Sequence, residues 1–442
     1  MRTTFAMVFV TCCIALLAIP HWAIGDPTVA PTSAPSVSAS RRPRVSASSA
    51  AASAAGEDWP SWRGPRGDGT SLETGVPIRW DDKQNVLWKT PIPGGGHSSP
   101  IAWGDRVWVT SADERAQARL LLCLDRADGK VLWQREVLRS APEHRNNLNS
   151  CASSTPATDG RYVWATFLQA ADNTVQVVCY DMDGKEVWRK SPGRLLSVHG
   201  YCSSMLPYKD TIILNADQDA EAYIVALDKA TGAERWRIDR PNRMRSYVPP
   251  VVFDLAGKKQ LVLSGSKCVA SYDPDTGKQF WIVDGPTDQF VASLVQADGV
   301  LMLTGGYPTL HILGIRPDGE GNVTKTHVLW HQKKDPSYVP SPIAFDKWLF
   351  VVADNGVTNC MEAKTGKYLW RQQLGRHHSS SPVLAEGRIY FLDDDGTTHV
   401  VKAGPEFELL AANKLAEPCR SSPAISRGCI YIRAEHNLYC IK

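Results

Sequence analysis

The part of this sequence that is expected to fold lacks an excess of charge of either sign. The 442 residues include 49 Lys and Arg and 46 Asp and Glu, and beyond residue 56 the two signs balance at 45 each. A neutral surface offers no broad basic field to nucleic acid and no acidic field to a polycation. We therefore do not expect a nucleic-acid-binding protein.

Long apolar runs are almost absent as well. Residues 5–19 alone approach the roughly 18 apolar residues that span a bilayer, and they follow Arg2 and precede Ala23 and Gly25. This pattern predicts a signal peptide over residues 1–25, with an uncleaved membrane anchor as the alternative. We therefore expect an exported protein, periplasmic or extracellular, with no transmembrane span if the signal is removed.

Apolar residues that could form a core are scarce in residues 26–56. Of these 31 residues, 23 are Ala, Ser, Pro or Thr. Such a composition buries little surface and predicts a disordered tether. The folded domain should therefore run from residue 57 to residue 442.

Local catalytic and metal-binding motifs are also missing. The chain contains no His-Glu-x-x-His, no Cys-x-x-Cys and no Gly-x-Ser-x-Gly. The acidic run at residues 215–221 begins like an EF-hand, but Ala220 stands where that loop needs glycine and Ala226 where it needs glutamate. We interpret this run as a solvated hairpin tip, and we assign no catalytic residue and no metal ligand.

What the sequence does contain is a repeat. One unit consists of an apolar residue and Asp, a Gly turn and an apolar-Trp pair, and it recurs with its Trp at positions 133, 188, 236, 281, 330 and 370. Between these units lie eight Ser/Pro segments, each followed by an alternating strand. Each repeat therefore predicts four short strands, A to D, which is the composition of a propeller blade.

The two ends of the chain indicate how the ring closes. The last repeat stops after its C strand at Lys442, whereas residues 86–90 form a Trp strand with no A, B or C strand before it. We predict an all-β fold, an eight-bladed β-propeller of four-stranded blades in which residues 86–90 complete blade 8. The alternative, a pair of β-sandwiches, does not explain why one end carries the strand that the other lacks.

These signatures resemble the PQQ-like (pyrroloquinoline-quinone repeat) β-propellers. That superfamily includes quinoprotein alcohol dehydrogenases and the BamB propeller of outer-membrane assembly, and residues 58–69 resemble the start of secreted PQQ-like propellers of planctomycete-type bacteria. The resemblance implies either a BamB-like, non-catalytic scaffold or a PQQ-dependent oxidoreductase. The family dehydrogenases carry a vicinal Cys pair and acidic Ca²⁺ ligands, but here the only vicinal pair is Cys12-Cys13. We therefore expect a scaffold with no cofactor, with PQQ and Ca²⁺ as the alternative.

The loops that enter each blade meet at the propeller axis and carry cationic and aromatic residues, whereas the B-to-C tips carry acids such as Asp217 and Asp354. We predict a basic, aromatic funnel inside an acidic rim, which binds a protein partner at the cell envelope or a small anionic ligand. The alternative is that these groups only pair locally. We expect a monomer, with the funnel formed by His97, Arg145, His199, Arg245, Tyr247, Tyr338, His377, His378 and Arg420.

Nine cysteines follow the signal. Cys123, Cys179, Cys360 and Cys440 occupy the small apolar position of C strands and are expected to pack in the core. Cys151 and Cys202 occupy the same register in adjacent blades and could form a disulfide in an oxidising compartment.

Overall fold

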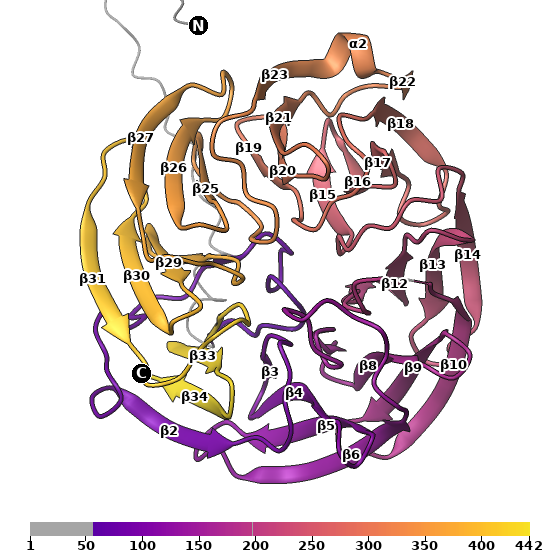
Figure 1. The fold of residues 1–442 in the computed structure, drawn as a ribbon, viewed down its shortest axis with the longest axis vertical. Coiled ribbons are helices and arrows are strands. Elements are labelled where there is room, and N and C mark those ends of the chain that lie inside the picture. The colour runs from indigo at the N-terminus through magenta and orange to yellow at the C-terminus, as the bar shows by residue number, and fades with distance from the viewer. Residues whose placement is uncertain (1–55, 197) are drawn as a thin grey trace, which may run out of the picture. The chain divides into compact units, whose positions relative to one another are not determined.

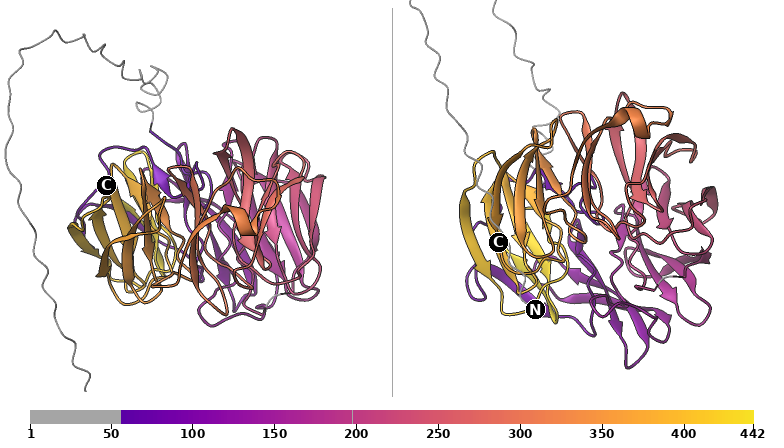
Figure 2. Two further views of the ribbon diagram at one scale, coloured as in Figure 1. Left: turned by 90° about the horizontal axis from the view of Figure 1, so that it is seen from above. Right: turned by 45° about the horizontal axis from the view of Figure 1, so that its top comes forward.

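The computed structural model describes residues 56–196 and 198–442, so the predicted signal peptide and residues 26–55 of the predicted tether lie outside the described residues. Eight sheets follow one another around a central axis (Figure 1), and a side view shows their strands running roughly along it (Figure 2). The predicted all-β, eight-bladed propeller is confirmed. Within residues 56–196 and 198–442, no helix has the length and apolar character that a membrane crossing requires.

The first four blades run in chain order, each with its A strand nearest the axis. Blade 1 contains β3 (Ile101–Trp103), β4 (Arg106–Asp113), β5 (Ala118–Asp125) and β6 (Val131–Arg139). Blade 2 contains β7 (Ala157–Thr158), β8 (Tyr162–Gln169), β9 (Thr174–Asp181) and β10 (Glu186–Arg194). Blade 3 contains β11 (Leu206–Tyr208), β12 (Thr211–Ala216), β13 (Ala222–Asp228) and β14 (Glu234–Arg240). Blade 4 contains β15 (Val251–Leu255), β16 (Lys258–Gly265), β17 (Cys268–Tyr272) and β18 (Gln279–Asp284), with β22 (Gly321–Asn322) added in parallel.

The remaining blades follow the same plan. Blade 5 contains β19 (Val295–Ala297), β20 (Val300–Gly305), β21 (His311–Ile315) and β23 (Val328–Gln332), with α2 (Thr324–His327) before β23. Blade 6 contains β24 (Ile343–Phe345), β25 (Trp348–Val352), β26 (Val357–Glu362) and β27 (Tyr368–Gln373). Blade 7 contains β28 (Val383–Ala385), β29 (Arg388–Leu392), β30 (Thr397–Lys402) and β31 (Leu409–Lys414), with β1 (Thr70–Ser71) added in parallel. Blade 8 contains β32 (Ala424–Ser426), β33 (Cys429–Arg433), β34 (Asn437–Ile441) and β2 (Val86–Pro91).

The ring closes through β2, as predicted. β2 pairs antiparallel with β34, with Trp88 opposite Cys440 and Lys89 opposite Tyr439, and the two strands lie side by side in Figure 1. Closure gives β34 a partner strand on both sides, as the third strand has in the other four-stranded blades.

The repeated Gly and Trp have a shared physical role between blades. The indole N–H of Trp88 donates to the Arg126 carbonyl in the turn of the next blade at 2.8 Å. Gly129 in that turn has φ +71°, and a Cβ there would lie 2.6 Å from the Trp88 ring. Only glycine therefore combines this backbone conformation with the close approach of the tryptophan. The same indole-to-carbonyl bond recurs for Trp133, Trp188, Trp330 and Trp370.

Glu417 ties the closing strand to blade 8. Its carboxylate lies 3.1 Å from the Lys89 ammonium and accepts hydrogen bonds from the Tyr439 hydroxyl (2.7 Å) and the His436 N–H (2.9 Å). Burial alone raises the pKa of Glu417, but these donors and Asn437 outweigh burial and lower the pKa to about 2.

We expect Glu417 to make blade closure sensitive to acid. Because its pKa is lowered on folding, its contribution is complete above the ordinary value of 4.5 and is lost as the pH falls towards 2. Glu417→Gln should lower the free energy of unfolding by about 1–3 kcal/mol at pH 7, and the gap to wild type should narrow below pH 4. Urea unfolding of both proteins between pH 7 and pH 3 measures this difference in the free energy of unfolding. A gap that stays constant would contradict the assignment.

Candidate binding site at the propeller axis

A chain of hydroxyl groups holds the inner ends of the blades together. The backbone N–H of Ser341 donates to the Ser381 hydroxyl, and that of Ser381 to the Ser422 hydroxyl, each at 2.9 Å. Equivalent bonds of 2.9–3.0 Å start from Ser99, Thr155, Ser293 and Ser422. The chain is interrupted in blade 4, where Pro249 supplies neither a hydroxyl nor an N–H. The Ser/Pro signature therefore encodes contacts between blades as well as strand starts.

Residues 57–71, which we call the plug, cross the axis at the inner strands. Figure 1 shows this indigo segment passing through the middle of the ring. The Trp59 N–H donates to the Ala102 carbonyl in blade 1 at 2.8 Å, and the Gly69 carbonyl accepts from the Leu384 N–H in blade 7 at 2.9 Å. The plug also bonds to Thr158 of blade 2 and Ser426 of blade 8. It therefore fills the end of the channel opposite the D-to-A loops.

Arg63 fixes the plug to the inner strands. Its side chain is buried, and its guanidinium donates to the Pro382 carbonyl (3.0 Å) and the Pro342 carbonyl (2.6 Å). Burial lowers the pKa of Arg63 to about 10, so it remains charged at neutral pH. The neighbouring Trp62 forms part of the cavity above.

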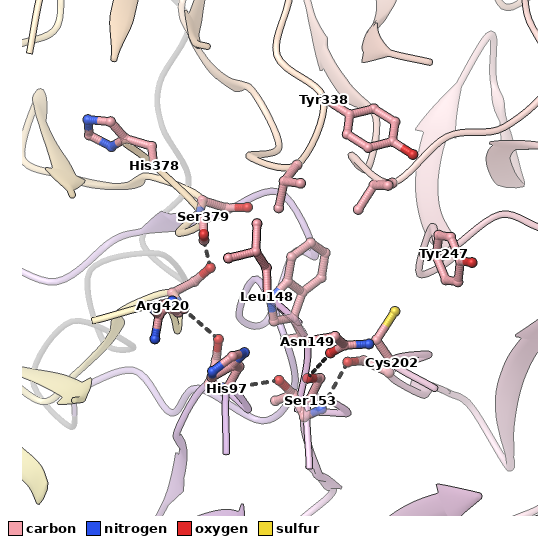
Figure 3. Close-up of a pocket in the computed structure, with 18 of the residues that line it drawn as sticks. His97, Leu148, Asn149, Ser153, Cys202, Tyr247, Tyr338, His378, Ser379 and Arg420 are labelled. Carbon is pink, nitrogen blue, oxygen red and sulfur yellow. Dashed lines mark hydrogen bonds between the residues drawn. The ribbon is translucent and has the colours of Figure 1, made fainter. Parts of the chain in front are cut away.

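Beside the plug lies a cavity of about 380 Å³, a volume within the range of small-molecule sites. Figure 3 shows its labelled side chains converging from several blades. Apart from Trp62 and Asp354, the residues that line it belong to the D-to-A loops and the starts of A strands. Leu148 lies within it with 65% of its surface exposed.

One side of the cavity carries positive charge. Arg420 and His97 lie there beside each other (Figure 3). Burial and the nearby charges of Arg420, Arg433 and Arg145 lower the pKa of His97 to about 4. The His97 imidazole is therefore neutral at physiological pH and has one N–H to donate.

The opposite side is aromatic. The rings of His199 and Tyr247 meet edge to face with centroids 6.0 Å apart, and the Tyr338 hydroxyl accepts a hydrogen bond from Gln289. The Asn149 side chain donates to the His199 carbonyl at 2.7 Å. That bond joins the long loops entering blades 2 and 3 into one wall.

Two neighbouring histidines differ in their availability. His377 is exposed, with its Nδ1 3.9 Å from Asp394. His378 is buried, and its ring nitrogens lie 2.7 and 3.1 Å from the carbonyls of Leu374 and Leu392. His378 therefore supports the loop, and His377 can contact a ligand.

The structure places seven of the nine predicted funnel residues around this cavity and the other two outside it. Arg145 and Arg245 do not line the cavity. Arg145 pairs with Glu114 at 2.6 Å, and Arg245 pairs with Asp219. Both arginines therefore form ion pairs with acids of the B-to-C tips, which is the alternative of local pairing.

The acidic rim is also only partly correct. Asp217 is buried and pairs with buried Arg240 at 2.8 Å, so residues 215–221 are not simply a solvated tip. Asp354 lies in the cavity, where its carboxylate accepts hydrogen bonds from the N–H groups of Tyr338 (2.6 Å) and Val339 (3.1 Å). Burial raises the pKa of Asp354 despite these bonds.

Cys151 is buried, and Cys202 lines the cavity. Both are free thiols in the structure, and burial raises the pKa of each to about 12. The disulfide between them stays a prediction for the oxidised protein.

The cavity does not offer the ligands that PQQ with Ca²⁺ requires. Ca²⁺ takes six to eight oxygen ligands, usually with several carboxylates, whereas Asp354 is the single carboxylate among the lining residues. No group of three or more His, Cys, Asp or Glu that could hold a metal occurs in residues 56–196 and 198–442. The residues present do not fit that cofactor.

Several cavity residues were not predicted from the sequence, namely Trp62, Leu148 and Asn149. Trp62 belongs to the conspicuous opening segment, but no local pattern indicates that this segment crosses the axis. Leu148 and Asn149 lie in the longest D-to-A loop, and that length was the only available signal.

The family model described as outer membrane protein assembly factor BamB matches residues 73–169, 123–297 and 322–404, together more than half of the chain. Comparison with curated protein sequences gives no significant match.

Among solved structures, BamB from Moraxella catarrhalis is similar with a TM-score of 0.58 and 13% identity, covering 81% of this chain and 97% of that one. Quinohemoprotein alcohol dehydrogenase from Comamonas testosteroni gives a TM-score of 0.59 and 12% identity, covering 90% and 82%. A europium-containing methanol dehydrogenase gives 0.58 and 13%, covering 86% and 90%. At these identities the likeness shows the fold alone.

Proposed function

The chain belongs to the PQQ-repeat family described as outer membrane protein assembly factor BamB, and from that membership we propose that it is an exported, non-catalytic scaffold that binds a partner at its axial face. The observation that carries the proposal is the axial cavity, which combines Arg420, exposed Leu148 and the tyrosines at residues 247 and 338. An exposed apolar side chain beside aromatic side chains and a cation is typical of protein-binding surfaces.

The second candidate is a PQQ-dependent oxidoreductase. The similar fold of the quinohemoprotein alcohol dehydrogenase favours it, but the fold alone does not carry an activity. The cavity's single carboxylate argues against it, because Ca²⁺ takes several oxygen ligands. We therefore place it second.

We expect partner contacts to concentrate at the axis. A photo-crosslinking amino acid at position 148 or 338 should capture a protein partner in cells, because both side chains line the cavity. The matched controls are Leu132 and Val187, which are 48% and 43% exposed on the outer D strands. Adducts are detected on denaturing gels and identified by mass spectrometry.

Two results would contradict the scaffold. Adducts from the outer positions alone would move the interaction surface to the blade edges. Dye reduction with alcohols or sugars that depends on added PQQ and Ca²⁺ would favour the oxidoreductase.

A further inference from the structure

Arg433 is a buried arginine whose side chain has no partner. It ends β33 with 1% of its surface exposed, and none of its three guanidinium nitrogens has a hydrogen-bond partner. Within residues 56–196 and 198–442, no other arginine leaves all three nitrogens buried and unpaired. Burial lowers the pKa of Arg433 to about 10, so the charge persists at neutral pH. An unpaired buried charge is strongly unfavourable, so a buried arginine of this kind is suited to holding an anion.

The strand register places Arg433 in the gap between blades 8 and 1. It lies two residues after Tyr431, which pairs with Ala424. In the same register of other blades, the side chains of Thr110 and Asn215 donate hydrogen bonds to the main chain of the loop that enters the next blade. Arg433 therefore faces the loop that enters blade 1 and carries His97.

Arg420 brings a second charge to the same corner. It lies beside His97 on the cavity wall (Figure 3). Its Nε is buried without a partner, and its guanidinium makes no ion pair with any acid in the described part of the chain. The corner thus joins two unpaired guanidinium groups and a neutral imidazole.

The nearby carboxylates are engaged elsewhere. Glu417, whose charge acts on Arg433, is held by Lys89 and Tyr439. Asp354 caps backbone N–H groups on the loop that enters blade 6. Glu417 acts on Arg433 only through its charge, and neither carboxylate forms an ion pair with Arg420 or Arg433.

We propose that this corner of the axial cavity binds a carboxylate, which Arg420 and His97 contact directly and Arg433 stabilises from within the gap between blades 8 and 1. The planar guanidinium of Arg420 matches a carboxylate in geometry and charge. Exposed Leu148 lies in the same cavity and suits an apolar group next to that carboxylate. The proposal rests on the axial binding function proposed above and names the chemistry that the ligand presents.

Calorimetry and thermal unfolding of the full chain test the site with three probes: succinate, N-acetyl-leucyl-aspartate and inorganic phosphate. Both carboxylates should bind saturably and raise the melting temperature. Arg420→Gln should weaken their binding about tenfold, the scale of one charge-assisted hydrogen bond. Tighter binding of N-acetyl-leucyl-aspartate than of succinate identifies a peptide as the source of the carboxylate, and equal binding identifies a small free acid.

Arg433→Met separates a binding role from a structural one. Removing an unpaired buried charge should leave the melting temperature without probe unchanged or higher, while probe binding weakens. The matched controls Arg145→Gln and Arg245→Gln should bind like wild type, because Glu114 and Asp219 already pair those arginines.

Three results overturn the proposal: no saturable carboxylate binding up to about 50 mM, binding of phosphate without carboxylates, or an Arg433→Met variant that melts lower and binds normally. None of them decides the scaffold function, because crosslinking from positions 148 and 338 does not require Arg420. Carboxylate binding without protein adducts would contradict the proposed scaffold function and would support the carboxylate site.

Discussion

Deleting residues 57–90 should remove most of the stability of the propeller. The deletion takes away the plug and almost all of β2, so β34 loses its partner strand and becomes an open edge. It also removes Trp88, which packs on Gly129 and bonds to the Arg126 carbonyl. We expect a much lower melting temperature and rapid proteolysis of residues 420–442, measured by calorimetry and limited digestion.

Two further variants keep this prediction testable if the deleted chain does not fold. Trp88→Ala should cost about 3–5 kcal/mol, because it empties a buried aromatic site at the closure. Deleting residues 26–55 is the control, since their composition predicts no contribution to a core. If deletion of 57–90 melts like this control, the ring does not depend on its amino-terminal strand.

Arg63→Met should lower the free energy of unfolding by about 3–5 kcal/mol. The change removes charge-assisted hydrogen bonds to the carbonyls of Pro342 and Pro382 and leaves these acceptors buried at the axis. The adjacent Trp62 lines the cavity, so loss of the anchor at Arg63 should disturb the cavity. Partner capture at positions 148 and 338 should therefore fall as well. Chemical denaturation and the crosslinking assay measure the two effects.

Arg66→Met is the matched control for Arg63. Arg66 lies in the same segment and pairs with Glu57, but its side chain is 32% exposed. An ion pair of this exposure contributes about 0–1 kcal/mol. If the two variants lose equal stability, burial at the axis is not what makes Arg63 important.

Local patterns predicted the blades and their number. Strand alternation, the Gly turn and the Trp of each unit act over a few residues, so they are legible in the sequence and recur wherever a blade recurs. The same logic predicted closure, because residues 86–90 read as a D strand with no A, B or C strand before it and the last repeat ends after its C strand. In any propeller the loops that enter the blades meet at the axis. The residues of these loops therefore predicted where the funnel lies.

Which charges remain available was decided by contacts between distant residues. Arg145, Arg245 and Arg420 look alike in the sequence, yet the first two meet acids 31 and 26 residues away and the third does not. Composition cannot distinguish them, because a guanidinium pairs with whichever acid the neighbouring loop presents.

The sequence by itself determined the architecture and the closing strand, since both follow from short-range patterning, and it predicted a candidate site at the axis. The tertiary structure alone decided that the opening segment is a plug, that Arg63 reaches a carbonyl 319 residues away, and that Arg433 is buried without a partner. These features depend on how eight blades meet at one axis. A hydrogen bond or an unpaired charge there is a property of the closed ring and of no single repeat.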